Sequence, residues 1–311
     1  MTEHYFLKGS GDIKGYIAAN ARQLFLPYSA DPKFPIDDVV ESHLRWLEQS
    51  ELIGLPRTEG GAAVERSPFD SDEIGVKVFK LAMTYPITAS TKGLDPLVAD
   101  MNKAVSGLGC SLMIARVDAR NVAFVQALER SGHVVCDVLT TYSLIPEALV
   151  RFDSEEVRIR DGRPTDAHWM IDMSVEGFSF SHYFNSPWVD ENSARRIIAK
   201  WIINSVTGYA DRVLVAEYNN EPIGYITLKK RRFSSDYSVD SIDLIAVSDA
   251  HRGKRVGRAL ISRAVDSLLE GDSLLYVGTQ AQNTAACRMY EAVGFRQVAL
   301  AVTLHKQLDA R

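Results

Sequence analysis

Apolar and polar residues occur in blocks along the chain, and the blocks predict alternating strands and helices. Apolar runs at 244–247 and 274–277 are each followed by a polar turn and then by a stretch typical of a helix. Short apolar runs bounded by polar turns are typical of buried strands. We therefore predict an α/β protein whose second half contains two strand–turn–helix units.

The first 65 residues carry a different pattern. Beginning at Asp37-Asp38, apolar residues recur at near-helical spacing as far as Leu52. The pair Gly60-Gly61 indicates a loop before the first strand. We expect a mostly helical extension over residues 1 to about 65.

The junction between the two halves of the chain lies near residues 146–157. Pro146 ends a strand, and Val157 to Arg160 has the pattern of a new one. The segment 163–167 then resembles a helix start, with Thr165 or Asp166 as the N-cap. These boundaries predict two domains, residues 1–150 and 151–311.

A degenerate repeat relates the two halves at an offset of 162 residues. Each copy has the pattern of a strand, an Asn-x-Ala helix, a glycine and a second strand. The matched positions are Gly109, Ser111, Leu112, Ala119, Asn121, Ala123, Glu129, Gly132 and Thr141, with Gly271, Ser273, Leu274, Ala281, Asn283, Ala285, Glu291, Gly294 and Thr303. We infer two similar units in tandem.

Composition narrows the functional classes. The net charge of −5 over 311 residues argues against nucleic-acid binding as the main function. The basic run 229–232 indicates either a solvated hairpin end or a patch that attracts phosphates. Neither the three cysteines nor the seven histidines have metal-site spacing, so we expect no metal and a reducing compartment. With no apolar run of membrane-span length and no signal-peptide pattern, we expect a cytoplasmic protein that does not bind membranes.

Candidate chemistry begins at residues 252–258, a basic loop with two glycines between a predicted strand and a predicted helix. Backbone N–H groups and a helix N-terminus that point to one place suit a phosphate or pyrophosphate. The spacing of a nucleotide-hydrolase P-loop is absent. The segment instead resembles the acyl-CoA pyrophosphate loop of the GNAT superfamily of N-acyltransferases, Arg/Gln-x-x-Gly-x-Gly/Ala, with Arg252 and Gly257 matching and Arg255 replacing the middle glycine.

A second block strengthens this resemblance. After the strand at 274–277 come Asn283, Tyr290 and Gly294-Phe295, which resemble the GNAT Asn-x-x-Ala helix, its tyrosine and its Gly-Phe. Asn283 and Tyr290 are two helical turns apart and share a face, and Gly294 suits a left-handed helix end. The resemblance to GNAT covers residues 157–306.

The resemblance implies an acyl-CoA-dependent enzyme that uses acetyl-CoA or another short acyl-CoA as co-substrate. Tyr290 would be the general acid that protonates the departing thiolate. Strand alternation places Asp243 on the same face as Ile245 and Val247, and Asp243 is one candidate base; His182 is the other, and solvent is a third source. The expected acyl-CoA contacts are Leu244, Ile245, Ala246, Val247, Arg252, Gly253, Lys254, Arg255, Val256, Gly257, Arg258, Asn283 and Ala286.

This chemistry is not repeated in the first unit. At the repeat offset, Leu128 replaces Tyr290, Ser90 replaces Arg252 and Asp95 replaces Gly257. A carboxylate repels a pyrophosphate. We expect the first unit to have lost acyl-CoA binding and to form one wall of the acceptor pocket.

Two segments bear on the acceptor. Residues 68–75 and the aromatic segment 178–188 resemble sugar-nucleotide N-acetyltransferases of the TDP-fucosamine acetyltransferase type. Rings can stack on a base or a sugar while Ser, His and Asn bind hydroxyls, although the same rings could simply be core. We expect Phe180, His182, Tyr183 and Trp188 to bind a TDP-linked 3- or 4-amino-dideoxyhexose.

Other functions stay open on the sequence alone. The same fold could acylate an antibiotic, a peptide or a protein amine, or it could be a non-catalytic CoA-binding module. A homodimer is also open.

Overall fold

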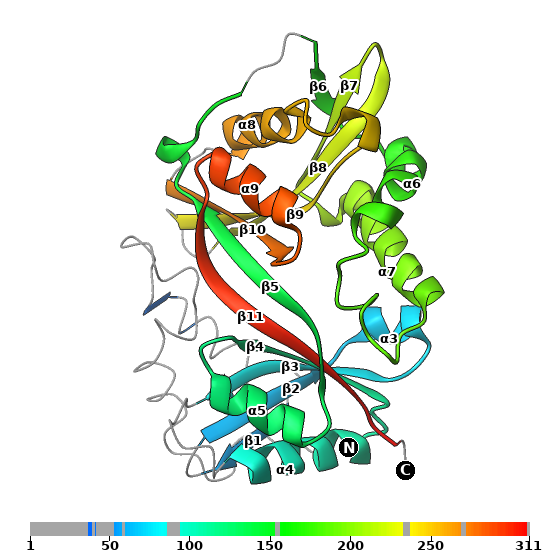
Figure 1. Ribbon diagram of the computed structural model, residues 1–311, viewed down its shortest axis with the longest axis vertical. Coiled ribbons are helices and arrows are strands. Elements are labelled where there is room, and N and C mark those ends of the chain that lie inside the picture. The colour runs from blue at the N-terminus through cyan, green and yellow to red at the C-terminus, as the bar shows by residue number, and fades with distance from the viewer. Residues whose placement is uncertain are drawn as a thin grey trace.

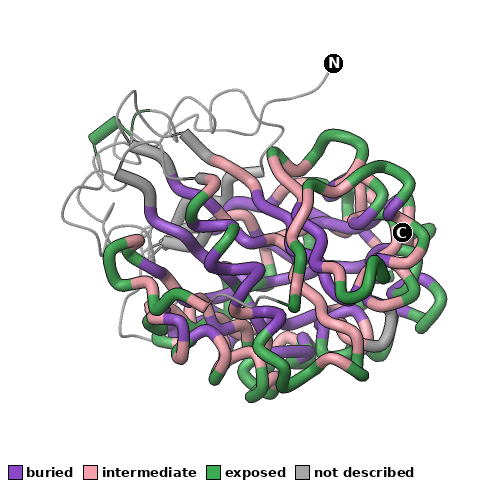
Figure 2. Tube along the Cα trace, turned by 90° about the horizontal axis from the view of Figure 1, so that it is seen from above, coloured by how far each residue is buried: buried purple, intermediate pink, exposed green. Residues whose placement is uncertain are grey.

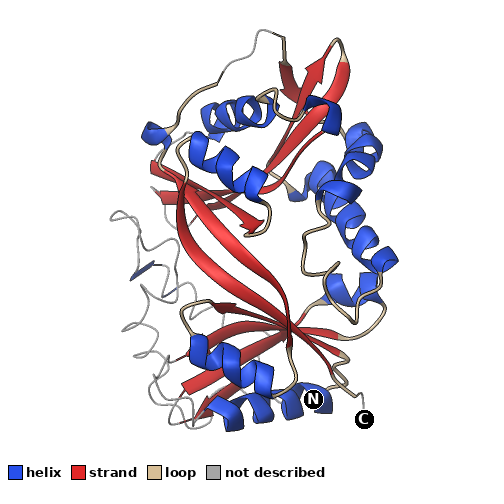
Figure 3. Cartoon of the chain, in the orientation of Figure 1, coloured by secondary structure: helices blue, strands red, loops and turns tan. Residues whose placement is uncertain are grey.

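The computed structural model describes residues 37, 38, 41, 53–57, 60–85, 94–152, 156–232, 237–268 and 272–309. They form one mixed sheet of 11 strands flanked by helices (Figures 1 and 3). The strands are β1 (Ile53–Arg57), β2 (Gly60–Arg66), β3 (Val78–Tyr85), β4 (Leu112–Asp118), β5 (Val134–Leu144), β6 (Arg158–Asp161), β7 (Arg212–Tyr218), β8 (Glu221–Arg232), β9 (Tyr237–Val247), β10 (Asp272–Gln280) and β11 (Arg296–Gln307). The helices are α3 (Pro68–Ile74), α4 (Leu94–Gly107), α5 (Val122–Arg130), α6 (Ala167–Gly177), α7 (Glu191–Asn204), α8 (Val256–Leu268) and α9 (Thr284–Ala292).

The two halves exchange their last strands. The strand order is β1-β2-β3-β4-β11-β5-β10-β9-β8-β7-β6, so β5 of the first half pairs with β10 and β11 of the second half pairs with β4. β5 and β11 also pair with each other, and Figure 1 shows them as the two long strands that connect the halves. Parallel pairs then flank this centre on both sides, β3 with β4 and β9 with β10. Because of this exchange, neither half completes its sheet alone.

The internal repeat is visible element by element. α5 and α9 begin after Asn121 and Asn283, whose side chains accept a hydrogen bond from the backbone N–H three residues on, at 3.2 Å in both cases. Both helices are followed by a left-handed glycine, Gly132 at φ +92° and Gly294 at φ +104°. α4 and α8 start at the same offset. The tandem α/β organisation predicted from the sequence is confirmed.

The N-terminal prediction needs correction. Residues 53–57 and 60–66 are not helix but an antiparallel pair of strands, and Gly60 opens β2 opposite Arg57 instead of lying in a loop. Ala62 and Val64 are buried beneath α4, a tertiary contact that local spacing does not reveal. Asp37, Asp38 and Glu41 are helical, as expected. The rest of the predicted helix to Leu52 lies outside the described residues.

The predicted start of α6 is displaced. A 3₁₀ turn at Pro164–Asp166 precedes the helix, and its N-cap position is Arg163 instead of Thr165 or Asp166. The Asp166 carboxylate accepts a backbone hydrogen bond from Arg163 at 2.7 Å and pairs with Arg160 at 2.8 Å. Asp166 thus bonds the N–H of a residue before it, whereas an N-cap residue bonds an N–H that follows it. The sequence pattern is the same in both cases.

Alternating side chains of the sheet enter different cores, and the buried trace in Figure 2 runs through the middle of the molecule. In the second half, Leu214 and Ile226 pack with α8, whereas Val215 and Tyr225 pack with α6 and α7. In the first half, one face packs against α4 and α5. Its other face is covered by α7 and by residues 183–189 of the second half.

Candidate active site

Two parallel strands separate at the centre of the second half. β9 and β10 pair only as far as Ile242 and Val277. Beyond that point β9 pairs with β8 up to Val247, while β10 turns to β5 and pairs as far as Leu139. Backbone groups on the β10 side of β9 therefore lose their strand partner at 244–247, the segment predicted to contact acyl-CoA. A splayed strand of this kind can hydrogen-bond an extended, amide-containing ligand.

The basic loop comes directly after β9. Gly253 and Arg255 both have left-handed backbone angles, φ +77° and +65°, and α8 begins at Val256. Because the first N–H groups of a helix lack intrahelical partners, the loop and the α8 N-terminus together favour an anion. Arg255 takes a conformation that glycine adopts more easily, which explains why the related pattern has glycine there.

The cationic side chains of the loop have individual partners. Arg252 pairs with Asp249 at 2.7 Å, and both side chains are exposed. The Arg258 guanidinium lies 4.7 Å from the centroid of the Phe152 ring. Lys254 is exposed. All the predicted loop contacts except Lys254 line one large cavity, as do the predicted strand contacts 245–247 but not the buried Leu244 side chain.

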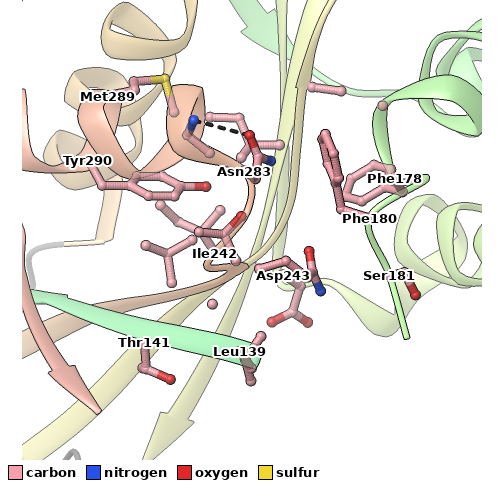
Figure 4. Close-up of a pocket in the computed structure, with 18 of the residues that line it drawn as sticks. Leu139, Thr141, Phe178, Phe180, Ser181, Ile242, Asp243, Asn283, Met289 and Tyr290 are labelled. Atoms are coloured by element: carbon pink, nitrogen blue, oxygen red, sulfur yellow. Dashed lines mark hydrogen bonds between the residues drawn. The ribbon is translucent and has the colours of Figure 1, made fainter. Parts of the chain in front are cut away.

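Helix α9 brings two of the predicted residues to this cavity. Figure 4 shows Asn283 and Tyr290 facing the same space. Asn283 uses its side-chain oxygen to cap the helix at the N–H of Ala286, which leaves its amide nitrogen for a ligand. Tyr290 is 2% exposed. Burial raises the pKa of its phenol above the ordinary value, and Cys287 and Tyr142 raise that pKa further, so the phenol stays protonated at neutral pH.

Asp243 lies at an irregularity of β9. The register between β8 and β9 shifts there, because Thr227 pairs with Leu244 while Leu228 pairs with Ile242. The Asp243 carboxylate accepts a hydrogen bond from Ser241 at 2.7 Å and lines the cavity with Ile245 and Val247. In Figure 4 it faces the space between β9 and the 178–181 segment. The face predicted for Asp243 is therefore the one that the cavity uses.

His182, the other candidate base, belongs to a buried polar chain. Its Nδ1 lies 2.8 Å from Nε2 of His305, and Nδ1 of His305 lies 2.9 Å from the Ser186 hydroxyl. Burial lowers the pKa of His182 well below its ordinary value, and the charges of Arg116, His305 and Lys80 lower it further. The imidazole is thus neutral at physiological pH, with one nitrogen already engaged.

The remaining acceptor-side residues are placed differently from one another. Phe180 is 38% exposed and lines the cavity, where Figure 4 shows it beside Phe178. Tyr183 is buried, and its hydroxyl donates to Asp70 at 2.5 Å. Trp188 packs in the cluster of α7, β3 and β4 and is not among the lining residues. Its position agrees with a core role for this ring.

The cavity has a volume of about 1660 Å³ and joins these parts. That volume exceeds the ~300–1,000 Å³ typical of a pocket for one small ligand, so it has room for two substrates. Its wall includes Glu65, Lys80 and Arg116 from the first half, which the sequence did not single out. They could be found only after β2, β3 and β4 had been placed beside β11, since nothing in their local pattern differs from an ordinary strand.

The first unit keeps the fold but lacks the residues to which the sequence analysis assigns the chemistry. Leu128, which stands where the second unit has Tyr290, is fully buried in the core. Asp95 stands where the second unit has Gly257 and pairs with Arg130 at 2.7 Å. Ser90 lies outside the described residues.

Other sequence features have local roles. Lys229 pairs with Asp211 at 3.1 Å at the end of the β8 hairpin. Burial raises the pKa of Cys110 and of Cys136 to about 11.

Among the described residues no group of His, Cys, Asp and Glu gathers in a way that could hold a metal ion. Within the same ranges no helix combines the length and apolar character needed to cross a membrane.

Comparisons with known proteins agree with this geometry. Residues 177–295 match the acetyltransferase (GNAT) family. The chain is 30% identical over 133 residues, 42% of its length, to the spore coat polysaccharide biosynthesis protein SpsD of Bacillus subtilis (strain 168). It is 29% identical over 115 residues, 36% of its length, to the L-amino acid N-acyltransferase MnaT of Escherichia coli (strain K12). These matches span 44% and 66% of the two relatives' own lengths.

A solved structure extends the comparison to both halves. A tandem GNAT protein from the clavulanic acid biosynthesis pathway aligns over 81% of this chain and 79% of its own, with a TM-score of 0.50 and 13% identity. At that identity the likeness concerns the fold alone. It covers both units, in agreement with the repeat. Over residues 177–295 the match to the GNAT acetyltransferase family agrees with the resemblance noted in the sequence.

Proposed function

We propose that this protein is an acyl-CoA-dependent N-acyltransferase that transfers an acetyl or other short acyl group to the amine of a sugar nucleotide. One observation carries the proposal: the protonated Tyr290 phenol opens into the cavity beside the point where β9 and β10 separate. A thioester lying along β9 would have its sulfur near a proton donor. The GNAT match supports the donor, and the name of SpsD, a polysaccharide biosynthesis protein, supports a sugar acceptor.

Donor binding rests on backbone geometry. The separated edge of β9 at 244–247 would hydrogen-bond the pantetheine amides, and a backbone N–H there would polarise the thioester oxygen. The loop 252–258 and the α8 N-terminus would hold the pyrophosphate. Asn283 would donate its amide N–H to the pantetheine arm.

The chemistry requires two proton movements. A neutral amine attacks the thioester carbonyl, the C–S bond breaks, and the thiolate takes the proton of Tyr290. The amine proton passes to a base. Asp243 and His182 both border the cavity, and Asp243 is the better candidate because His182 already shares Nδ1 with His305 in cationic surroundings.

The acceptor assignment is a dTDP-linked 3- or 4-amino-dideoxyhexose. Phe178 and Phe180 at the cavity can stack on a base or a sugar face. The name of MnaT, an L-amino acid N-acyltransferase, favours a free amino acid as the second candidate. Amines of antibiotics, peptides and proteins, and a CoA-binding role without catalysis, have no comparable support from the cavity.

The test is acceptor-dependent release of free thiol. The full-length protein is mixed with acetyl-CoA, or a series of short acyl-CoAs, and with dTDP-amino sugars, free amino sugars or L-amino acids. Release with dTDP-amino sugars alone supports the proposal. Release only with L-amino acids replaces the acceptor, and tight CoA binding without release from any pair rejects catalysis.

A further inference from the structure

The first half of the chain presents a charged patch to the cavity. Glu65 pairs across the sheet with Lys80, and Lys80 pairs with Ile114, two residues before Arg116. Because side chains alternate along a strand, Lys80, Ile114 and Arg116 share one face. All of them line the cavity.

Lys80 is already committed to a partner. It forms an ion pair with Asp70, a fully buried carboxylate of α3. Asp70 also accepts hydrogen bonds from Ser67 and from the Tyr183 hydroxyl. A buried carboxylate needs this compensation, so the Lys80–Asp70 pair is structural and contributes little net charge to the cavity.

Arg116 differs from Lys80. Its Nε donates to the Thr303 hydroxyl of β11 at 3.1 Å, a neutral partner that orients the guanidinium. Within the described residues Arg116 forms no ion pair, and its side chain is exposed to the cavity. The nearby Asp137 accepts a hydrogen bond from Gln280 at 3.3 Å through Oδ2, whereas its buried Oδ1 has no hydrogen-bond partner within the described residues. The terminal nitrogens of Arg116 are therefore available to a ligand.

Two carboxylates lie near Arg116, but neither forms an ion pair with it within the described residues: Glu65 pairs across the sheet with Lys80, and Asp137 accepts from Gln280. The imidazoles of His182 and His305 lie on the same face, and burial together with the charge of Arg116 lowers the pKa of both, so that they stay neutral. The cations of 252–258 belong to the donor end of the cavity and are on a different unit. A planar guanidinium fixed at Nε matches the two oxygens of a phosphate or carboxylate.

We infer that Arg116 binds the anionic group of the acceptor, the diphosphate of a sugar nucleotide or the carboxylate of an amino acid. This inference rests on the proposed function. It gives the first unit, which lacks a counterpart of Tyr290, the role of recognising the acceptor. The two ligand sources share an oxyanion and differ in the group that carries it.

Binding measurements test this without relying on turnover. Calorimetry with the full-length protein saturated in CoA, so that the donor site is filled, measures affinity for dTDP and for an N-acetyl-L-amino acid. Arg116→Gln should lower the affinity for whichever of the two ligands binds by about 10- to 100-fold, as expected for loss of a hydrogen-bonded charge. Arg116→Lys should lower that affinity less. Arg120→Gln is the control, because Arg120 is paired with Asp118 on the same unit and does not line the cavity.

The outcomes separate this inference from the proposed function. If Arg116→Gln loses affinity for dTDP, the group that Arg116 binds is a diphosphate. If it loses affinity for the N-acetyl-L-amino acid, that group is a carboxylate. Equal affinity in Arg116→Gln and wild type, or no binding of either anion to wild type, overturns the role of Arg116 even if acetyl-CoA is turned over. If Arg116→Gln loses anion binding while no amine releases thiol, the acyl-transfer proposal fails and the anion site stands. Unchanged CoA affinity and melting temperature would show that the variant is folded.

Discussion

Gly257 and Met289 lie in direct contact across helices α8 and α9. A Cβ placed on Gly257 would come 2.5 Å from the Met289 sulfur and 3.8 Å from Cγ2 of Val247. The glycine in the basic loop thus allows α8 to approach the helix that carries Tyr290. The loop proposed to bind phosphate and the helix that carries the proposed proton donor are thus in direct contact.

Gly257→Ala should therefore weaken the donor site. Displacing α8 or Met289 should raise KM for acetyl-CoA about tenfold, equivalent to about 1.4 kcal/mol, at the low end of the ~1–3 kcal/mol that overpacking costs. Adding Met289→Ala should restore most of the affinity by making room. If the double variant is as weak as the single one, contact with Met289 is not the cause.

Arg255→Gly should stabilise the protein. A non-glycine residue in the left-handed region costs about 1–2 kcal/mol, and glycine removes this strain. Glycine also loses more conformational freedom on folding, which offsets about 0.5–1 kcal/mol of the gain. The expected net gain is about 0.5–1 kcal/mol in the free energy of unfolding, measured by urea titration. Lys254→Gly removes the same charge from an exposed position outside the left-handed residues and should destabilise; a gain there too would point to charge instead of backbone strain.

Tyr290→Phe should lower kcat and leave the affinity for CoA unchanged. Loss of a general acid typically costs ~10²–10⁴ in rate. Because the pKa of this phenol lies above its ordinary value, kcat of the wild type should not fall through deprotonation of Tyr290 up to about pH 10. Tyr142→Phe is the matched control: its ring lies 5.8 Å from that of Tyr290, its hydroxyl bonds Glu291, and it does not line the cavity. Equal losses in both variants would make Tyr290 a packing residue.

The residues of the proposed donor half could be placed on one cavity from the sequence because they are contiguous in it. Residues 244–258 and 283–290 each form a strand or loop and a helix in one local unit, so spacing alone indicates which side chains share a face. Even with the shift of register at Asp243, this residue stays on the cavity side.

The proposed acceptor half could not be predicted in the same way. Arg116 enters the cavity only because β4 pairs with β11, where it faces Thr303, 187 residues away. The exchange of β5 and β11 depends on pairings between the two halves, and a local pattern carries no information on partners that distant. For the same reason Phe180 and Trp188, which belong to one aromatic segment, could not be sorted into cavity wall and core beforehand.

Acid should destabilise the protein through its buried histidines. Burial and the charge of Arg116 lower the pKa of His305 to about 3, whereas the unfolded side chain titrates near ~6.5. Below pH ~6.5 this histidine is protonated in the unfolded chain but stays neutral in the folded protein. As pH falls from there towards about 3, the free energy of unfolding therefore decreases by about 1.4 kcal/mol per pH unit for this group. His305→Gln should flatten that slope. Replacement of His168, exposed on α6, should not.

Asp243→Asn should distinguish the two candidate bases. If Asp243 accepts the amine proton, kcat of the Asp243→Asn variant should fall about 100-fold. KM for acetyl-CoA should stay unchanged, because only the proton-accepting step is removed. His182→Gln should lose less than about tenfold in kcat, since the imidazole is desolvated, surrounded by positive charge and already bonded to His305. The pH dependence of kcat/KM is the second readout: its acidic limb should disappear in Asp243→Asn and persist in His182→Gln. The opposite pattern would assign the base to the histidine and leave Asp243, through its bond to Ser241, a structural role at the bend of β9.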